Sequence, residues 1–252
     1  MDPEVLEKII AAGELVEDDT VFEIGAGAGT LTVDLAKKVK RVIALENDKR
    51  LIKPLSLAVR DLKSVEVINE DFLKFDLSKK ISNTTSYKVV ADIPYYITGE
   101  IIKRLFALPH KPSLIVLLVQ QEVAERITAG PGKTSIMSIA TQLYSDPEII
   151  FKVPASAFFP SPEVESAVIK LRVSKQIKIM VEEEKFFRLL RIGFSARRKT
   201  LLNNLSAGFK LSKEKTAEQL KNAGIGENTR AQELTLEEWN RIYKILLPYL
   251  TK

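Results

Sequence analysis

Five short, nearly continuous apolar runs in the first 173 residues constrain the fold most strongly. They are rich in Val and Ile, and they lie at residues 20–24, 41–45, 65–68, 88–91 and 114–119. Strands that are buried on both faces of a parallel sheet have this pattern. The segments between them, such as LTVDLAKKV and GEIIKRLFAL, are amphipathic and suit crossover helices. The alternation predicts an α/β fold in which helices flank a Rossmann-like sheet.

Both ends of this region also carry local signals. Asp2 and Pro3 predict the N-cap and first residue of a helix. Residues 148–153 and 164–173 are strand-like and predict an antiparallel pair at the sheet edge, whereas the chain from about Val181 has only helical patterns. We therefore expect a catalytic α/β domain at residues 1–175 and a small all-α domain at residues 176–252.

The composition excludes several kinds of chemistry. The chain has no cysteine and a single histidine, His110, so disulfides, thiolate nucleophiles and multi-histidine metal sites are not expected. It also lacks an apolar run of the ~20 residues that cross a membrane and a basic-then-apolar signal segment. We expect a cytoplasmic protein that uses no metal and has no membrane partner.

Positive charge is concentrated in the last part of the chain. Residues 174–252 hold 16 Lys and Arg against nine Asp and Glu, whereas residues 1–173 hold 22 against 24. Such an asymmetry favours an anionic partner, most often nucleic acid. Guanidinium groups suit phosphate, so RNA binding is expected at five cations that no acid interrupts, although a solvated helix face is the alternative. These cations are Arg188, Arg191, Arg197, Arg198 and Lys199.

A glycine-rich turn follows the first predicted strand. Gly25 and Gly27 stand two residues apart after Glu23, and Thr30 occupies the position where a dinucleotide-binding fingerprint has its third glycine. The spacing is instead similar to the S-adenosylmethionine (SAM) loop of Rossmann-like methyltransferases. Glu23, Gly25 and Gly27 are therefore candidate cofactor-binding residues, and a tight turn without a ligand is the alternative.

Three acids follow successive predicted strands. Glu46 comes 21 residues after Gly25, Asp71 another 25 residues later and Asp92 another 21. The ends of parallel strands meet at one edge of the sheet, so these side chains are expected to share one site. Glu46 is placed to accept the ribose hydroxyls of a nucleoside and Asp71 its adenine amino group, with Phe72 packing on the ring.

The segment Asp92-Ile93-Pro94-Tyr95 is similar to the [DNS]-[PIL]-P-[YFW] motif of methyltransferases that act on amino nitrogens of bases. Such a nitrogen is a poor nucleophile because its lone pair is delocalised into the ring. Oxygen atoms that accept its two hydrogens favour a pyramidal nitrogen. Pro94 stiffens the turn, Tyr95 offers a face for an extruded base, and Phe158, in a Pro-rich loop, is a candidate for the opposite face. A Pro-containing loop with a buried tyrosine is the alternative.

The whole chain resembles the KsgA family of small-subunit ribosomal RNA adenine dimethyltransferases. The similar segments are DPEVLEKII, VFEIGAGAGTLT, VIALENDKRL, INEDFL, ADIPYYIT, QQEVAERITAGPG, SAFFPSPEVESAV, FSARRKTLLNNL and GIGENTRAQELT.

The resemblance implies a SAM-dependent enzyme that adds two methyl groups to N6 of each of two adjacent adenosines. These adenosines lie in a hairpin loop near the 3′ end of small-subunit rRNA, and the family also acts in subunit assembly. Gly25, Glu46 and Asp71 would bind SAM, and Asp92, Tyr95 and Phe158 would hold the target adenine. The immature small subunit is the expected partner, and we expect a monomer.

The sequence departs from the family pattern in two places. The family usually has asparagine where this chain has Asp92. It also has a Gln-Asn-Phe-Leu segment before the helix at Asp2, which helps to bind SAM; either this sequence is truncated or the site lacks that cover. Two other functions stay open: a large-subunit rRNA methylase of the macrolide-resistance type, and a non-catalytic RNA-binding assembly factor.

Overall fold

The structure is a computed structural model that describes residues 2–82 and 86–250 of the 252-residue chain. The chain divides into two compact units, one formed by Met1–Ala124 with Asp146–Lys175 and one by Glu125–Ser145 with Gln176–Lys252. Within the described residues, no helix is both long and apolar enough to cross a membrane.

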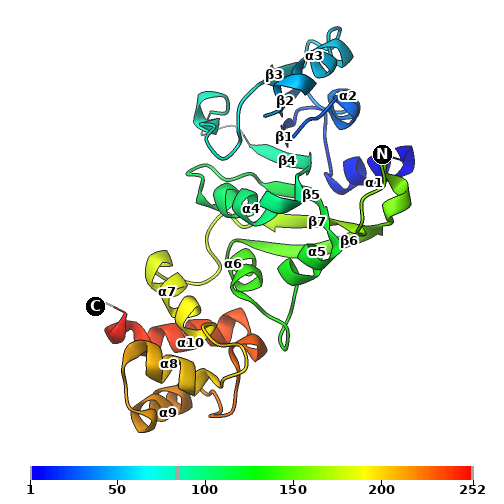
Figure 1. The fold of residues 1–252 in the computed structure, drawn as a ribbon. Coiled ribbons are helices and arrows are strands. Elements are labelled where there is room, and N and C mark those ends of the chain that lie inside the picture. The colour runs from blue at the N-terminus through cyan, green and yellow to red at the C-terminus, as the bar shows by residue number, and fades with distance from the viewer. Residues whose placement is uncertain (1, 83–85, 251–252) are drawn as a thin grey trace. The chain divides into compact units, whose positions relative to one another are not determined.

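The first unit is built on a sheet of seven strands among the described residues, in the order β3-β2-β1-β4-β5-β7-β6 (Figure 1). Neighbours from β3 to β5 run parallel, and β7 pairs antiparallel with β5. The strands are β1 Thr20–Ile24, β2 Arg41–Leu45, β3 Val65–Ile68, β4 Tyr87–Asp92, β5 Leu114–Gln120, β6 Ser145–Val153 and β7 Ser166–Val173.

Burial along the strands explains their composition. Every residue of β1 is buried, and so are the first six of the seven residues of β5, because both strands lie inside the sheet. Strand β3, at one edge, is only half-buried. The runs at β1, β2, β4 and β5 therefore correspond to mostly buried strands, as predicted, whereas the run at β3 lies at an edge and is only half-buried. The predicted fold class, a Rossmann-like sheet flanked by helices, is confirmed.

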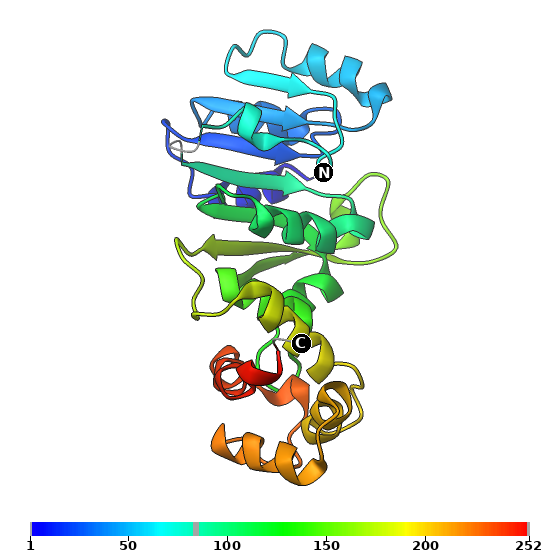
Figure 2. The ribbon, with the colours of Figure 1, turned by 90° about the vertical axis from the view of Figure 1, so that its left-hand side faces the viewer.

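Helices cover the two faces of this sheet. Figures 1 and 2 show α1 and α2 on one face and α4 on the other. Asp2 caps α1 by accepting the N–H of Glu4 at 2.8 Å, and Pro3 is its first residue, as predicted. The helices and short 3-10 turns are α1 Pro3–Ala12, α2 Thr30–Ala36, α3 Lys49–Ala58, η1 Leu77–Lys79, η2 Tyr95–Ile97, α4 Thr98–Ala107, α5 Gln121–Ile127 and η3 Ala155–Ala157.

The second unit is helical. Its elements are α6 Ile136–Tyr144, α7 Glu183–Gly193, α8 Leu201–Phe209, α9 Lys213–Asn222, η4 Ala231–Glu233, α10 Leu236–Leu246 and η5 Leu247–Tyr249. Trp239 is fully buried at its centre, and a Cβ on Gly193 would lie 2.3 Å from the indole ring, so only glycine fits there.

The segment 125–145 differs from the sequence-based division, which placed it in the first domain. In the structure it belongs to the helical unit. Thr134 donates its N–H and its hydroxyl to the carbonyl of Gln232, at 3.1 and 2.9 Å, and Gly132 donates to the same oxygen at 2.8 Å. These bonds join residues about a hundred positions apart, which no local sequence pattern indicates.

Candidate active site

Two hollows open at the carboxyl ends of β1, β2 and β4. The larger has a volume of about 680 Å³ and the smaller about 260 Å³, and Gly25 and Asp92 line both. The larger hollow contains most of the predicted site residues: Gly25, Glu46, Asp71, Phe72, Asp92, Pro94 and Tyr95. The smaller contains Glu23, Gly25, Gly27, Asp92 and Phe158. The fold therefore brings together all the site residues that the sequence predicted in this unit.

The glycine turn lets the backbone lie at the junction of the two hollows. Gly25 has a φ of +76° and Gly27 a φ of +60°, which L-residues with side chains rarely adopt. The N–H groups of Gly25 and Ala26 both donate to the carbonyl of Leu45, at 2.8 and 3.0 Å. A Cβ on Gly25 would lie 3.5 Å from the carbonyl oxygen of Asp92 and 3.7 Å from Pro94 Cδ. A side chain here would fill the space between the hollows.

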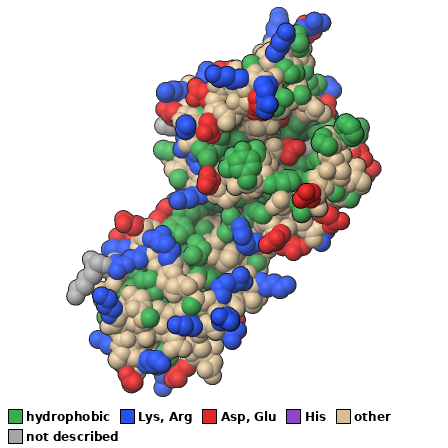
Figure 3. All heavy atoms as spheres, viewed as in Figure 1, with side chains coloured by type: hydrophobic (Ala, Val, Ile, Leu, Met, Phe, Trp, Pro, Cys, Tyr) green, Lys and Arg blue, Asp and Glu red, His purple; other side chains and the backbone are tan. Residues whose placement is uncertain are grey.

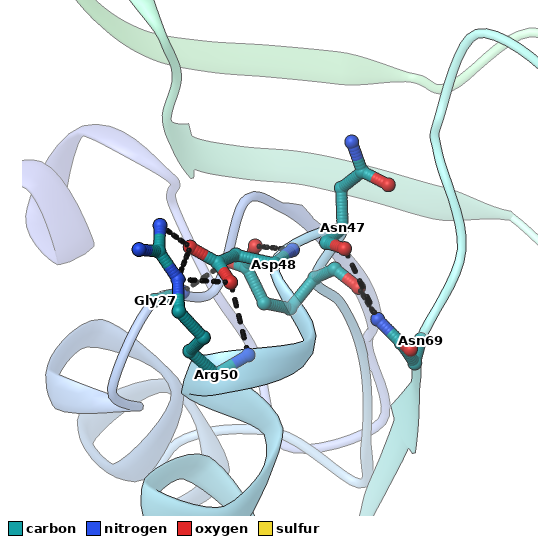
Figure 4. Close-up of polar contacts among 6 residues, drawn as sticks. Gly27, Asn47, Asp48, Arg50 and Asn69 are labelled. Carbon is teal, nitrogen blue, oxygen red and sulfur yellow. Dashed lines mark hydrogen bonds and ion pairs between the residues drawn. The ribbon is translucent and has the colours of Figure 1, made fainter.

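Glu46, directly after β2, is buried and held by backbone donors on both carboxylate oxygens. Oε2 accepts the N–H of Gly27 at 2.8 Å, and Oε1 accepts the N–H of Asp48 at 2.7 Å. Asn69 donates to the Glu46 carbonyl at 2.8 Å, and Figure 4 shows these contacts with their neighbours. Each carboxylate oxygen has a second lone pair, so Glu46 can still accept from a ligand. The sequence did not indicate the supporting roles of Asp48 and Asn69.

Asp71 and Phe72 form another part of the wall of the larger hollow. Asp71 Oδ1 accepts the N–H of Leu73 at 2.9 Å, which fixes the carboxylate at the start of the turn after β3. The Phe72 ring is 5% exposed and lies 5.9 Å, between centroids, from Phe22. The Arg104 guanidinium lies 5.7 Å from the Phe72 ring centroid. Phe22 and Arg104, which the sequence analysis did not single out, thus pack against the Phe72 ring.

Glu23, the acid of the glycine motif, is only 1% exposed, and it accepts the Thr32 hydroxyl at 2.6 Å. Burial, together with the nearby carboxylates of Asp92 and Glu46, raises the pKa of Glu23 to about 8. The side chain is therefore mostly neutral at pH 7. Its hydrogen bond ties the end of β1 to α2.

The turn after β4 places Asp92, Pro94 and Tyr95 beside one another. Burial raises the pKa of Asp92 to about 6, so the group is mostly ionised at pH 7. The hydroxyl of Tyr95 is 2.6 Å from the Ser166 hydroxyl, and the Tyr95 carbonyl accepts from Thr98 at 3.2 Å. These bonds fix a half-buried tyrosine ring beside a carboxylate in the larger hollow.

Phe158 is half-buried and lines the smaller hollow. Its N–H donates to the carbonyl of Ala155 at 3.2 Å, and the Ser161 hydroxyl donates to the same oxygen at 2.8 Å. The Pro-rich loop is thus closed on itself. Asp92 and Phe158 border one hollow, as a pocket for a planar amino-bearing ring requires.

The five predicted RNA-binding cations lie in the second unit, at the end of α7 and in the loop before α8. Arg191, Arg197, Arg198 and Lys199 are exposed, and in the described part of the chain no carboxylate lies within ion-pair distance of them. Arg188 differs, because it is half-buried and donates to the carbonyl of Leu250 at 3.2 Å. Figure 3 shows many Lys and Arg side chains on the surface of this unit.

A buried asparagine supports this basic loop. Asn204 is 3% exposed, and its amide nitrogen donates to the carbonyls of Gly193 at 2.7 Å and Ala196 at 3.1 Å. The Phe194 ring stacks on Trp239 with centroids 5.4 Å apart. The loop that carries Arg197 is therefore attached to the helical core at its start.

Comparison with known proteins decides the family. A profile described as "Ribosomal RNA adenine dimethylase" matches residues 1–247. The chain belongs to the ribosomal RNA adenine dimethylase family. The resemblance predicted from the sequence is thus confirmed, and with it an enzyme of the rRNA adenine methyltransferase class.

Individual members of the family support the same conclusion. "Ribosomal RNA small subunit methyltransferase A" of Alkaliphilus metalliredigens is 44% identical over 97% of this chain and 88% of its own length. The protein of that name from Clostridioides difficile is 38% identical over 98% of this chain and 87% of its own length.

Solved structures agree with this fold. A dimethyladenosine transferase from Plasmodium falciparum superposes with a TM-score of 0.85 and 26% identity, over 98% of this chain and 97% of that one. The 23S rRNA methyltransferase ErmE has a TM-score of 0.79, also at 26% identity, over 98% of both chains. In the described residues, no group of three or more His, Cys, Asp or Glu could hold a metal ion.

Proposed function

We propose that this chain transfers methyl groups from SAM to N6 of two adjacent adenosines in the 3′-terminal hairpin loop of small-subunit rRNA. We further propose that it acts in the cytoplasm as a monomer, on an immature small subunit whose assembly it assists. The observation that carries the proposal is the pair of hollows that meet at Gly25 and Asp92. The candidate cofactor groups Glu46, Asp71 and Phe72 line the larger hollow. The candidate groups for the target base are divided between the hollows, with Tyr95 in the larger, Phe158 in the smaller and Asp92 in both.

The residues of the larger hollow fit SAM. The backbone at Gly25 leaves open the space that a Cβ would fill. Glu46 retains lone pairs for ribose hydroxyls, and Asp71 with Phe72 offers an acceptor and a ring face for adenine. The cofactor supplies an electrophilic methyl group on a positively charged sulfonium, and the surrounding carboxylates favour that charge.

The chain's own contribution to chemistry is to orient the target amino group. Asp92 accepts one N6 hydrogen, and the two faces of the extruded adenine lie against Tyr95 and Phe158. Pro94 carries no N–H that would compete for the Asp92 oxygens. Rate enhancement then comes from proximity and from hydrogen bonds that expose the nitrogen lone pair. Direct displacement of this kind requires no metal.

The RNA backbone is assigned to Arg191, Arg197, Arg198 and Lys199. They are exposed cations without a neighbouring carboxylate, so binding phosphate breaks no ion pair. Arg188 is half-buried and donates to the carbonyl of Leu250, so it is less available to phosphate than the four exposed cations. Matched charge-reversal variants test this assignment below.

The decisive experiment is to incubate the protein with radiolabelled SAM and unmethylated small ribosomal subunits, and then to map the modified nucleotides by mass spectrometry. The proposal expects dimethyladenosine at two adjacent positions near the 3′ end of the small-subunit rRNA. Labelling of large-subunit RNA instead would favour the alternative represented by ErmE. SAM-independent binding to subunits without methyl transfer would favour an assembly factor, a candidate that Asp92 in place of asparagine keeps open.

A further inference from the structure

Two aromatic side chains are exposed to an unusual degree. The chain has one Trp, six Tyr and eleven Phe residues, all of them in the described segments. Among these, only Tyr96 and Phe159 are exposed, at 87% and 96%. The other large rings of the described segments are buried or half-buried, so the exposure of these two marks a surface that binds another molecule.

Both rings border the active site. Tyr96 lines the larger hollow and Phe159 the smaller one, and each hollow includes Asp92. The neighbouring backbone is well anchored. The N–H of Ile97 donates to the carbonyl of Pro94 at 3.3 Å, and on the other side Ser161 donates to Ala155. Because these hydrogen bonds already order the neighbouring backbone, binding a ligand to the two rings costs little additional backbone entropy.

The charge around the two hollows limits what these rings can bind. The smaller hollow, at Phe159, is lined by Glu23 and Asp92 and by no Lys or Arg. The larger hollow, at Tyr96, is more acidic. Five acids line it, Glu46, Asp48, Glu70, Asp71 and Asp92. The one cation in its lining, Arg50, already pairs with Asp48 at 2.6 Å. Phosphate groups are repelled here, so RNA at this mouth must be held by contacts that carry no charge. Stacking on an aromatic face is such a contact, and every base offers one.

We propose that Tyr96 and Phe159 are stacking platforms for the bases on either side of the nucleotide being methylated. Removing the target base from its stack leaves the neighbouring base faces uncovered, and the two rings cover them. This inference rests on the proposed function, because it assumes an RNA target at Asp92. It adds a binding site for the flanking nucleotides, which the pocket for the target adenine does not supply.

The test uses Tyr96→Ala and Phe159→Ala in the full chain, with small subunits reconstituted from rRNA whose 3′ segment is synthetic. Each variant should raise KM for the subunit by about 5- to 150-fold, the range of one base–aromatic stack. For Phe159→Ala, the kcat and the SAM affinity measured by calorimetry should not change. For Tyr96→Ala, whose ring borders the hollow assigned to SAM, the KM for the subunit is measured at saturating SAM. Tyr96→Phe should restore the wild-type KM because the ring is kept. Leu57→Ala is the matched control, since Leu57 is 58% exposed in the same unit but lines neither hollow.

A second arm identifies the partner of each ring. Subunits are prepared with an abasic nucleotide on the 5′ or the 3′ side of the target pair. The abasic site should raise KM for the wild-type protein, and it should cause no further loss in the variant that lacks the corresponding ring. Additive losses would mean that the ring contacts another group, such as a ribosomal protein, and would overturn the inference. So would alanine variants that behave like Leu57→Ala. If the wild-type protein itself fails to methylate the subunits, the proposed function fails instead.

Discussion

The hollow of the first unit and the basic loop of the second unit carry opposite charges. Five acids line the larger hollow, whereas the loop carries Arg197, Arg198 and Lys199 with no carboxylate near them among the described residues. A carboxylate-lined site favours a cationic cofactor and neutral base edges, and exposed guanidinium groups favour phosphate. The comparison teaches that methyl transfer and RNA affinity are assigned to separate residues. Substitutions in the hollow should therefore change methyl transfer but not RNA affinity, and substitutions in the loop should do the reverse.

The largest expected effect tests the chemical side alone. Asp92→Ala removes the acceptor for the amino group, and kcat for methyl transfer should fall about 100- to 1000-fold, as when one preorganised hydrogen bond to a reacting group is lost. RNA affinity, measured by filter binding, should stay within a factor of two or so, because Asp92 contacts no phosphate. An equal loss of RNA affinity would show that the two regions are not separate.

Glu46→Ala should weaken SAM binding by about 1–3 kcal/mol. The ribose hydroxyls lose an acceptor, and the N–H groups of Gly27 and Asp48 lose the acceptor that they have in the wild type. Calorimetry measures the change. Glu46→Gln is the control, since it keeps one side-chain oxygen, and it should fall between the wild type and the alanine variant. Unchanged affinity in Glu46→Ala would remove Glu46 from the cofactor site.

The phosphate side is tested by changing Arg197 and Arg198 together to Glu. Two lost phosphate contacts should reduce the steepness of the log–log salt dependence by about 1.4 to 1.8, and lower affinity about 25- to 60-fold at ~0.1 M salt. SAM affinity should not change. Changing Lys213 and Lys221, two exposed lysines of α9, to Glu gives the same charge change as a control. Equal effects of both pairs would mean that the loop is only a solvated surface.

The smallest expected effect concerns the charge at residue 92. Burial raises the pKa of Asp92 from 3.8 to about 6, so the folded chain holds this proton up to a higher pH than the unfolded chain does. The contribution of Asp92 to the free energy of unfolding should therefore decrease as pH rises from about 4 to 6. Asp92→Asn should remove that contribution and leave the one of Glu23, whose raised pKa acts in the same direction up to about pH 8. Denaturant unfolding at several pH values measures it.

The same group should control the product. Activity should fall as pH decreases through about 6, because the protonated carboxyl donates where it should accept. After methyl transfer the neighbouring positive charge is lost, and Asp92 takes up a proton more readily. Monomethyladenosine should then accumulate, and mass spectrometry of the Asp92→Asn product should show a larger dimethyl fraction. A fall to background activity in that variant would contradict this account.

Sequence patterns predicted most of the first unit because each strand is a short continuous segment and most of its inner strands are apolar and buried. The runs at residues 20–24, 41–45 and 65–68 match β1, β2 and β3 at both ends, whereas β4 begins one residue earlier than expected, at Tyr87. The two strand-like segments before residue 174 do form strands, with β7 lying between β5 and β6. The placement of 125–145 could not be predicted, since Thr134 finds its partner at Gln232.

The candidate site was predictable to the extent that it follows strand ends. The register of Glu46, Asp71 and Asp92 placed all three around one hollow. What each group already contacts was not predictable. The Thr32 hydroxyl donates to the Glu23 carboxylate, and Arg188 donates to the carbonyl of Leu250. Tertiary packing brings each of these pairs together. The exposure of Tyr96 and Phe159 likewise depends on surfaces that a linear pattern does not describe.

The grouping of 125–145 with the helical unit affects how the chain is made. Because synthesis proceeds from the N-terminus, every strand of the sheet is complete once residue 173 has been added. The segment with α6, by contrast, must wait for Gln232, which is synthesised about a hundred residues after Thr134. The helical unit therefore completes its folding only after Gln232 has been synthesised. A nascent chain stopped at residue 175 would have a finished sheet but an α6 segment without the partners that hold it.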